Sequence, residues 1–170
     1  SDIESIKIKT HESAIRIISK VGPLNNPADR DHCLQYMIAV PLAFGNLTAE
    51  HYEDEFHHSN PIIDALREKM TVEEEARYTA EYLESEKRSI ANSLQVFFKD
   101  GSVTEEIEIN YPVGHRRRRE EGIPLLEEKF MTNLLTVFPK GRCNTIYDLC
   151  KDQEKLENTR VNDFMDLFIP

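Results

Sequence analysis

The sequence lacks the features that mark membrane-spanning and exported proteins. No apolar run approaches the roughly 18 residues that would indicate a membrane span, and the opening SDIESIKIKT has no apolar signal-peptide core. Cysteine is scarce too, because Cys33, Cys143 and Cys150 are widely spaced and form no CxxC pair. Neither a disulfide framework nor a zinc knuckle is therefore encoded. We expect a soluble protein of a reducing compartment, either the cytoplasm or, if the source is eukaryotic, the mitochondrial matrix.

Positive charge is also in deficit. The chain has 31 acidic and 21 basic residues and a formal net charge of -10. Such a surface repels phosphate backbones and anionic lipids, so we expect neither nucleic acid nor a membrane as a partner. The sequence has no glycine-rich phosphate loop, no GxSxG and no HExxH. Phosphoryl transfer, serine hydrolysis and zincin chemistry therefore lack the residues that they need.

The length of 170 residues favours one compact domain with a possible tail over two independent domains. The chain has no initiator methionine, and strand alternation begins almost at once, with Ile6 and Ile8 set between Lys7 and Lys9. We therefore expect a part excised from a longer protein.

The first part of the chain has the pattern of one strand followed by helices. The strand ends near Thr10, which we expect to cap a short helix. Asn26 then caps a second helix, and Pro27 occupies its first position, where a missing N–H costs nothing. This helix should run for roughly 18 residues to Gly45, with a kink at Pro41.

The clearest local signal is the stretch LQVFFKDGSVTEEIEINY. Apolar residues alternate on both sides of Asp100-Gly101, a pair typical of a two-residue primed turn, so we expect a β-hairpin. Residues 71–88 fit either a strand or a helix, and after Pro124 the apolar periodicity is helical again. The sequence therefore predicts an α+β fold, in which an antiparallel sheet with a central β-hairpin is packed by helices and followed by a C-terminal helical segment.

The stretch ADRDHCLQYM holds the first candidate site residues. Helix capping alone explains Asp29, because a carboxylate complements the helix dipole there. Arg30 has the wrong charge for a first turn. His32 and Tyr36 are four residues apart and would project an imidazole and a phenol from one helical face. This pattern predicts a site, and the alternative is an ordinary structural hydrogen bond.

The run GHRRRREEG is a second candidate. His115 and Arg116 could turn inward to hold a small polycarboxylate, since guanidinium groups match carboxylates bidentately. The alternative is a solvated loop whose arginines pair with nearby carboxylates. Three more histidines, His51, His57 and His58, stand among acidic residues but lack metal-ligand spacing, so we expect a surface loop there and no metal site.

Several stretches together resemble the C-terminal part of the MmgE/PrpD family. They are THESAIRIISKVGPLNNPADRDHCLQYMIAVPL, YPVGHRRRREEGIPLLEEKF and VNDFMDLFIP, and the resemblance covers nearly the whole chain. It implies a longer protein with a mainly helical domain upstream and an α+β lid. Residues 1–139 would form the lid, and residues 140–170 would be a helical segment that packs on the missing helical domain. Because apolar surface meant for that domain would be exposed, we expect a homo-oligomer.

The resemblance further implies a hydro-lyase that removes water from 2-methylcitrate to give 2-methyl-cis-aconitate in propionate catabolism, through the methylcitrate cycle. The substrate would be a small tricarboxylate, and no cofactor, iron–sulfur cluster included, is expected. On this likeness Tyr36 and His32 would be catalytic, while Arg30, His115 and Arg116 would bind the substrate. The chain alone should be inactive, because other acid–base residues would lie upstream. The alternative is a non-catalytic, lid-like module that binds a small polycarboxylate or a partner protein.

Overall fold

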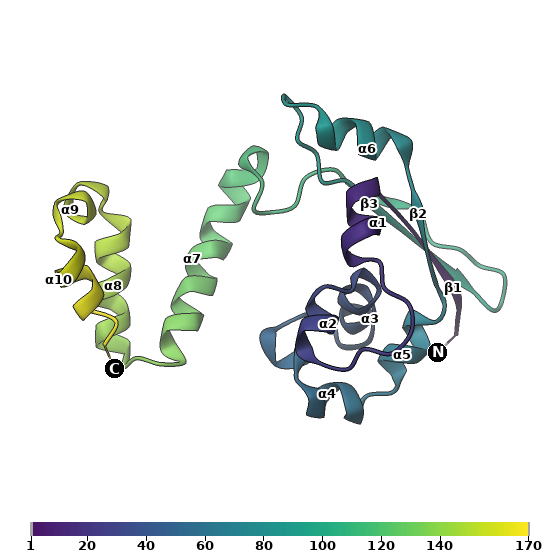
Figure 1. Cartoon of the computed structure of the whole chain (residues 1–170), viewed down its shortest axis with the longest axis horizontal. Coiled ribbons are helices and arrows are strands. Elements are labelled where there is room, and N and C mark those ends of the chain that lie inside the picture. The colour runs from purple at the N-terminus through teal and green to yellow at the C-terminus, as the bar shows by residue number, and fades with distance from the viewer. Residues whose placement is uncertain (1, 170) are drawn as a thin grey trace. The chain divides into compact units, whose positions relative to one another are not determined.

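The computed structural model describes residues 2–169, and the chain divides into two compact units, Ser1–Pro112 and Val113–Pro170 (Figure 1). We refer to them as unit 1 and unit 2. The boundary that the sequence predicted between residues 139 and 140 lies inside unit 2. The assignment of residues 1–139 to a lid and of residues 140–170 to a returning helical segment stays a prediction.

Unit 1 is built on a four-stranded sheet in the order β2-β1-β3-β4 (Figure 1). Its strands are β1 (Ile3–Thr10), β2 (Met70–Glu74), β3 (Asn92–Phe98) and β4 (Ile107–Ile109). β1 pairs antiparallel with β3, and β3 with β4, but β1 and β2 run parallel. The α+β class is confirmed, whereas the prediction of an antiparallel sheet is only partly right, because the sheet is mixed. The reason is the long helical connection from β1 to β2, a crossover that lets both strands run in one direction.

Alternation along β1 places the core of unit 1 on one face of the sheet. Ile6 and Ile8 are each 1% exposed, and successive side chains of a strand point to opposite faces. Ile6 lies opposite Val96 of β3 and Ile8 lies opposite Leu94, so the apolar face continues across both strands. Buried side chains of the helices complete this cluster, among them Tyr36, Ala39, Val40, Ile63 and Leu66.

Short helices connect the strands of unit 1. They are α1 (Glu12–Ile18), α2 (Pro27–Asp31), α3 (Leu34–Phe44), the 3-10 helix η1 (Ala49–Tyr52), α4 (Asp54–Ser59), α5 (Ile62–Arg67) and α6 (Ala76–Leu83). The prediction that Thr10 caps α1 is wrong, because Nδ1 of His11 accepts from the N–H of Ala14 at 3.2 Å and so caps this helix. Residues 71–88, which fitted either class, contain most of β2 and all of α6.

The single long helix predicted from Asn26 to Gly45 is two helices. Its ends are confirmed, because the Asn26 side chain accepts from the N–H of Asp29 at 2.9 Å and Gly45 ends α3 with a φ of 84°. Between them His32 closes α2, and Cys33 has an extended backbone with φ -123° and ψ 107°. Cys33 has no exposed surface. Burial of this thiol in the core therefore outweighs helix propensity at the break.

The hairpin between β3 and β4 is confirmed, but its turn differs from the prediction. Of the pair Asp100-Gly101 only Gly101 has a positive φ, 85°. Its N–H donates to the carbonyl of Phe98 at 3.0 Å, and the N–H of Phe98 donates to the carbonyl of Ser102 at 2.9 Å. These bonds enclose a three-residue loop with glycine in the left-handed region, in place of a two-residue primed turn.

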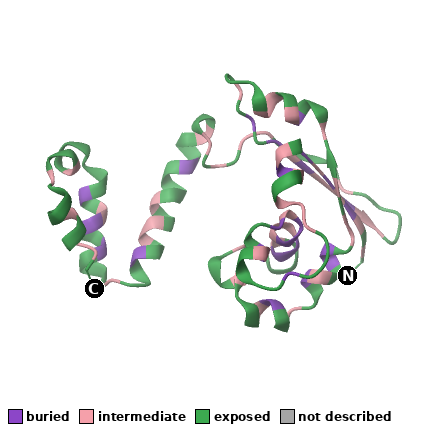
Figure 2. Ribbon diagram, in the orientation of Figure 1, coloured by how far each residue is buried: buried purple, intermediate pink, exposed green. Residues whose placement is uncertain are grey.

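Unit 2 consists of helices around a small core. They are η2 (Arg116–Arg118), α7 (Arg119–Leu135), α8 (Lys140–Lys151), α9 (Gln153–Asn158) and α10 (Val161–Asp166). Its buried cluster contains Leu134, Cys143 and Ile146, and Figure 2 shows that most of the surface of these helices is exposed. Within residues 2–169, no helix has the length and apolar character needed to cross a lipid bilayer.

We expect Asn26→Ala to lower the free energy of unfolding by about 1 kcal/mol, because it removes the side-chain acceptor for the first turn of α2. Asn25→Ala is the matched control, since the Asn25 side chain is exposed and makes no hydrogen bond to the described residues. Urea denaturation followed by circular dichroism measures both variants. Equal stabilities of the two would contradict the capping role.

Candidate active site

The centre of the candidate site is Arg30, whose side chain has no exposed surface. Its Nε donates to the backbone carbonyl of Tyr52 at 2.7 Å, and its Nη1 lies 3.4 Å from Nδ1 of His57. Its Nη2 forms an ion pair with Asp54, and this hydrogen bond lowers the pKa of the Asp54 carboxyl below its usual value. A buried charge requires such partners. Arg30 therefore ties α2 to η1 and α4.

The chain of polar contacts continues beyond His57. Nε2 of His57 lies 3.1 Å from Oδ2 of Asp64, and Nη1 of Arg67 donates to Oδ1 of the same carboxylate at 2.5 Å. Nη2 of Arg67 donates to the carbonyl of Gly22 at 2.9 Å. We call Arg30, His57, Asp64 and Arg67 the polar relay. It connects α2, α4 and α5 with the loop that follows α1.

The contacts of the polar relay determine the hydrogen-bond roles of the two His57 ring nitrogens. A guanidinium group only donates, so Nδ1, which faces Arg30, is the acceptor, and Nε2 is the donor to Asp64. Burial alone would raise the pKa of Asp64, but hydrogen bonds from Arg67 and His57 hold this pKa below its usual value. The relay therefore includes a carboxylate that stays ionised at neutral pH.

Tyr36 lies in the core beside this relay and has no exposed surface. Its hydroxyl donates to the carbonyl of His51 at 2.5 Å, and its ring stands edge-on to that of His57, with centroids 5.5 Å apart. Burial raises the pKa of Tyr36 to about 12, although the positive charge of Arg30 opposes the rise. The phenol is therefore protonated at neutral pH, the form in which it can donate a proton or a hydrogen bond.

The structure separates His32 from Tyr36. Because the helix breaks between them, the predicted pairing of the two rings on one helical face is wrong. The imidazole of His32 is 61% exposed and contacts the carboxylate of Asp31 at 2.5 Å. Arg30, expected to bind substrate, instead directs its N–H groups to protein acceptors. The substrate roles of His32 and Arg30 stay predictions.

His115 and Arg116 belong to unit 2. Nδ1 of His115 accepts from the N–H of Arg117 at 3.2 Å and so caps η2. In the same run Arg118 forms an ion pair with Glu121 at 2.6 Å, which agrees with the alternative of arginines paired to nearby carboxylates. Binding of a substrate carboxylate by His115 and Arg116 stays a prediction.

The expectation of a histidine-bearing surface loop is wrong for His57, which is 8% exposed and has a partner at each ring nitrogen. His51 has a structural role, because its Nδ1 accepts from the N–H of Thr48 at 2.8 Å at the start of η1. His58 alone of the three is exposed, as expected. His57 and its partners on α5 were therefore not predicted as site residues.

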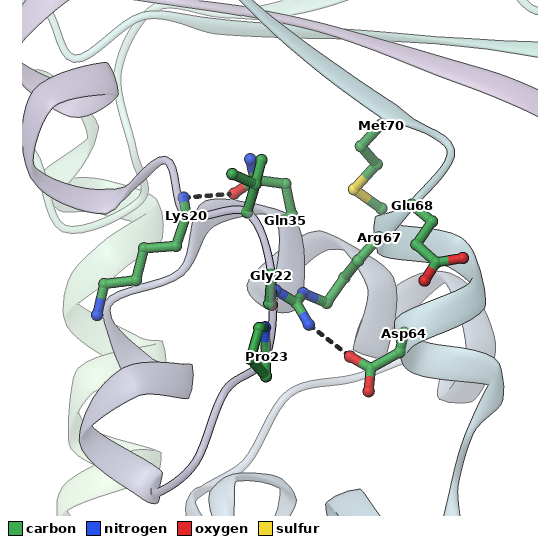
Figure 3. Close-up of a pocket in the computed structure, with 9 residues that line it drawn as sticks. Lys20, Gly22, Pro23, Gln35, Asp64, Arg67, Glu68 and Met70 are labelled. Carbon is green, nitrogen blue, oxygen red and sulfur yellow. Dashed lines mark hydrogen bonds and ion pairs between the residues drawn. The ribbon is translucent and has the colours of Figure 1, made fainter.

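A cavity of about 420 Å³ lies at the far end of the polar relay (Figure 3). It is lined by Lys20, Val21, Gly22, Pro23, Gln35, Asp64, Arg67, Glu68 and Met70. In Figure 3 the guanidinium group of Arg67 extends toward Gly22 and Asp64. Its Nε is buried and has no hydrogen-bond partner within residues 2–169, an arrangement that costs about 1–3 kcal/mol. The cavity shares Asp64 and Arg67 with the relay, whereas Tyr36 does not line it.

We expect unit 1 to lose stability as the pH rises from about 10 to about 12. The pKa of Tyr36 is about 12 in the fold and has an ordinary value of 10.0 in an unfolded chain, so the unfolded chain releases the phenolic proton first. Rising pH therefore lowers the free energy of unfolding across this window, and Tyr36→Phe should remove the contribution of Tyr36 to this pH dependence. Urea denaturation at several pH values measures the free energy of unfolding. The same pH dependence in the variant would contradict the burial effect.

Comparison with known proteins identifies the family. Residues 1–153 match the MmgE/PrpD C-terminal domain. The chain is 52% identical over 169 residues to a 2-methylcitrate dehydratase of Salmonella typhimurium. The matched residues make up 99% of this chain and 35% of the relative. Identity to a 2-methylcitrate dehydratase of Cupriavidus necator is 52% over 168 residues, 99% of this chain and 34% of the relative.

A eukaryotic relative is equally similar. The chain is 51% identical over 168 residues to a mitochondrial 2-methylcitrate dehydratase of Yarrowia lipolytica. The matched residues make up 99% of this chain and 32% of the relative. The chain thus spans about a third of the length of the curated relatives it matches. Since the family match covers unit 1 and extends through α8, the chain belongs to the MmgE/PrpD family and carries its C-terminal domain.

Proposed function

We propose that the chain is the C-terminal part of a 2-methylcitrate dehydratase, a hydro-lyase that eliminates water from 2-methylcitrate to give 2-methyl-cis-aconitate in the methylcitrate cycle of propionate catabolism. The observation that carries this proposal is the identity of 50 to 52% over nearly the whole chain to relatives with that name. The remaining two thirds of the enzyme would supply the other acid–base groups, so the chain by itself would be inactive.

Elimination of water needs a base for a carbon-bound proton, an acid for the departing hydroxyl and cations for the substrate carboxylates. Tyr36 is our candidate acid or oxyanion partner, since its buried phenol is protonated at neutral pH and can donate. In unit 1 its hydroxyl donates to the carbonyl of His51. To act on substrate it would exchange this carbonyl for a substrate oxygen. This exchange would accompany the approach of the upstream domain.

The remaining candidates would serve the substrate carboxylates. His32 presents an exposed imidazole beside Asp31 and would assist the proton transfer. Arg30 would act through its positive charge near Tyr36, because each of its three side-chain nitrogens already contacts a protein acceptor. His115 and Arg116 would bind a carboxylate from unit 2. No cofactor or metal is required for these roles.

The second candidate function is a non-catalytic module that binds a small polycarboxylate or a partner protein. It is favoured by the complete burial of Tyr36 and by the cavity near Arg67, which Tyr36 does not line. Measurement of turnover distinguishes the two functions, since only the first converts a substrate and requires Tyr36 to touch a reacting atom.

We further propose that residues 140–170 pack on the upstream helical domain and that the protein forms a homo-oligomer. The compartment would be the bacterial cytoplasm or the mitochondrial matrix, as the Salmonella and Yarrowia relatives suggest. The support for packing is the exposed apolar surface of unit 2. A groove of about 550 Å³ between α7 and α8 is lined by Ile123, Leu126, Phe130 and Cys150 together with polar residues.

The test of the function uses the intact protein, with its upstream part, and 2-methylcitrate as substrate. We expect dehydration by the intact protein and none by the chain alone. Tyr36→Phe should lower turnover by about 10²- to 10⁴-fold, the usual range for a lost general acid. Tyr82→Phe, which changes the ring stacked on His11, is the matched control. Full turnover by Tyr36→Phe would remove Tyr36 from the site, and no dehydration by the intact protein would refute the enzyme assignment.

The apolar groove of unit 2 generates a second test. We expect the chain alone to self-associate, because Ile123 is 50% and Leu126 64% exposed and contiguous apolar surface favours association. Leu126→Lys should weaken this association, whereas Thr132→Lys, an equal change of charge on the same helix outside the groove lining, should leave it intact. Light scattering over a range of concentrations measures the mass. A monomeric mass at high concentration would contradict this prediction.

A further inference from the structure

We infer that His57 is a positioning residue for Tyr36, acting on the phenol ring by direct contact and, through Arg30, on the segment whose carbonyl accepts from the Tyr36 hydroxyl. This inference rests on the proposed function, in which Tyr36 donates a proton or a hydrogen bond to the substrate. His57 itself would touch no substrate atom. Its proposed effect is therefore on turnover, by way of the geometry of Tyr36.

The first step concerns the acceptor of the phenol. The Tyr36 hydroxyl donates to the carbonyl of His51, and Nε of Arg30 donates to the next carbonyl in the chain, that of Tyr52. Arg30 also holds the carboxylate of Asp54. Tyr36 and Arg30 thus both bind backbone carbonyls of residues 51–54, a segment that the contact of His51 with Thr48 also holds. We expect a shift of the Arg30 guanidinium to move the Tyr52 carbonyl and with it the neighbouring His51 carbonyl, the acceptor of the phenol.

The second step concerns what holds Arg30. A planar guanidinium group holds its N–H donors in fixed directions. Nη1 of Arg30 lies 3.4 Å from its acceptor, Nδ1 of His57. His57 cannot turn away freely, because its Nε2 lies 3.1 Å from Asp64 and the same carboxylate binds Arg67. Through the polar relay, α5 therefore holds His57, His57 holds Arg30, and Arg30 binds Tyr52 and Asp54.

The third step is direct contact. The ring of His57 stands edge-on to that of Tyr36 at an interplanar angle of 72°, and the Tyr52 ring packs on Tyr36 with centroids 5.9 Å apart. Two aromatic neighbours thus restrict rotation of the phenol about its ring axis. Since Nε of Arg67 has no partner in the described part of the chain while its Nη groups bind Asp64 and Gly22, the relay does not satisfy every donor. A role in positioning would account for keeping this arrangement.

The experiment is a double-mutant cycle in the intact protein with 2-methylcitrate as substrate. His57→Leu keeps volume but removes both ring nitrogens, and we expect turnover to fall by about 10²-fold, as for a misplaced catalytic group, with KM changed less than about 2-fold. His57→Gln retains one acceptor and one donor and should recover most of this loss. Glu55→Gln, at an exposed position of the same helix, is the control and should leave turnover unchanged.

The double variant that combines His57→Leu with Tyr36→Phe tests whether His57 acts through Tyr36. If His57 acts through Tyr36, His57→Leu should lower turnover by less than about 3-fold when Tyr36 is already Phe, because coupled residues are not additive. Equal losses from His57→Leu in both backgrounds, or no loss at all, would overturn the inference and leave the function intact. Full turnover by Tyr36→Phe would instead refute the proposed role of Tyr36. If His57→Leu does not fold, Asp64→Asn replaces it, since an amide leaves His57 or Arg67 without its acceptor.

Discussion

The burial of one positive charge is the constraint on which unit 1 depends. Arg30 has no exposed surface, and burying an ionised group is unfavourable unless it is paired and hydrogen-bonded. Its partners come from Tyr52, Asp54 and His57, all in a segment that contains only short helices and has little apolar periodicity. Such short helices have little stability of their own. The need to satisfy Arg30 therefore explains why η1 and α4 take a defined place against α2.

Local signals in the sequence predicted the elements that depend on neighbouring residues. The alternation of β1, the Asn26 cap and the Gly45 end of α3 each follow from backbone chemistry within a few residues. The break at Cys33 could not be predicted, because it depends on burial against segments far away in the sequence. The parallel pairing of β1 with β2 escaped prediction for the same reason, since strand direction is set by the path of the intervening helices.

The candidate site shows the same division. Arg30 could be singled out because its charge does not suit the first turn of a helix, yet its partners could not be named from spacing. His57, Asp64 and Arg67 lie seven and three residues apart, a pattern that carries no recognised motif. The signal available was Arg67, a charged residue next to the apolar Leu66 in a helix of only six residues. A helix of six residues has fewer than two turns. Hydrophobic periodicity over so few residues cannot show whether Arg67 faces the core or the solvent.

The division of the chain bears on how such a site could work. Tyr36 is buried by unit 1 itself, so its phenol is already desolvated and protonated before any substrate arrives. A donor prepared in this way needs little reorganisation when charge develops on a substrate oxygen, which is the main advantage of a preorganised site. The requirement is that the hydroxyl be released from the carbonyl of His51 at the right moment. Because that carbonyl lies next to the one bound by Arg30, the proposed function requires this segment to shift when the upstream domain docks.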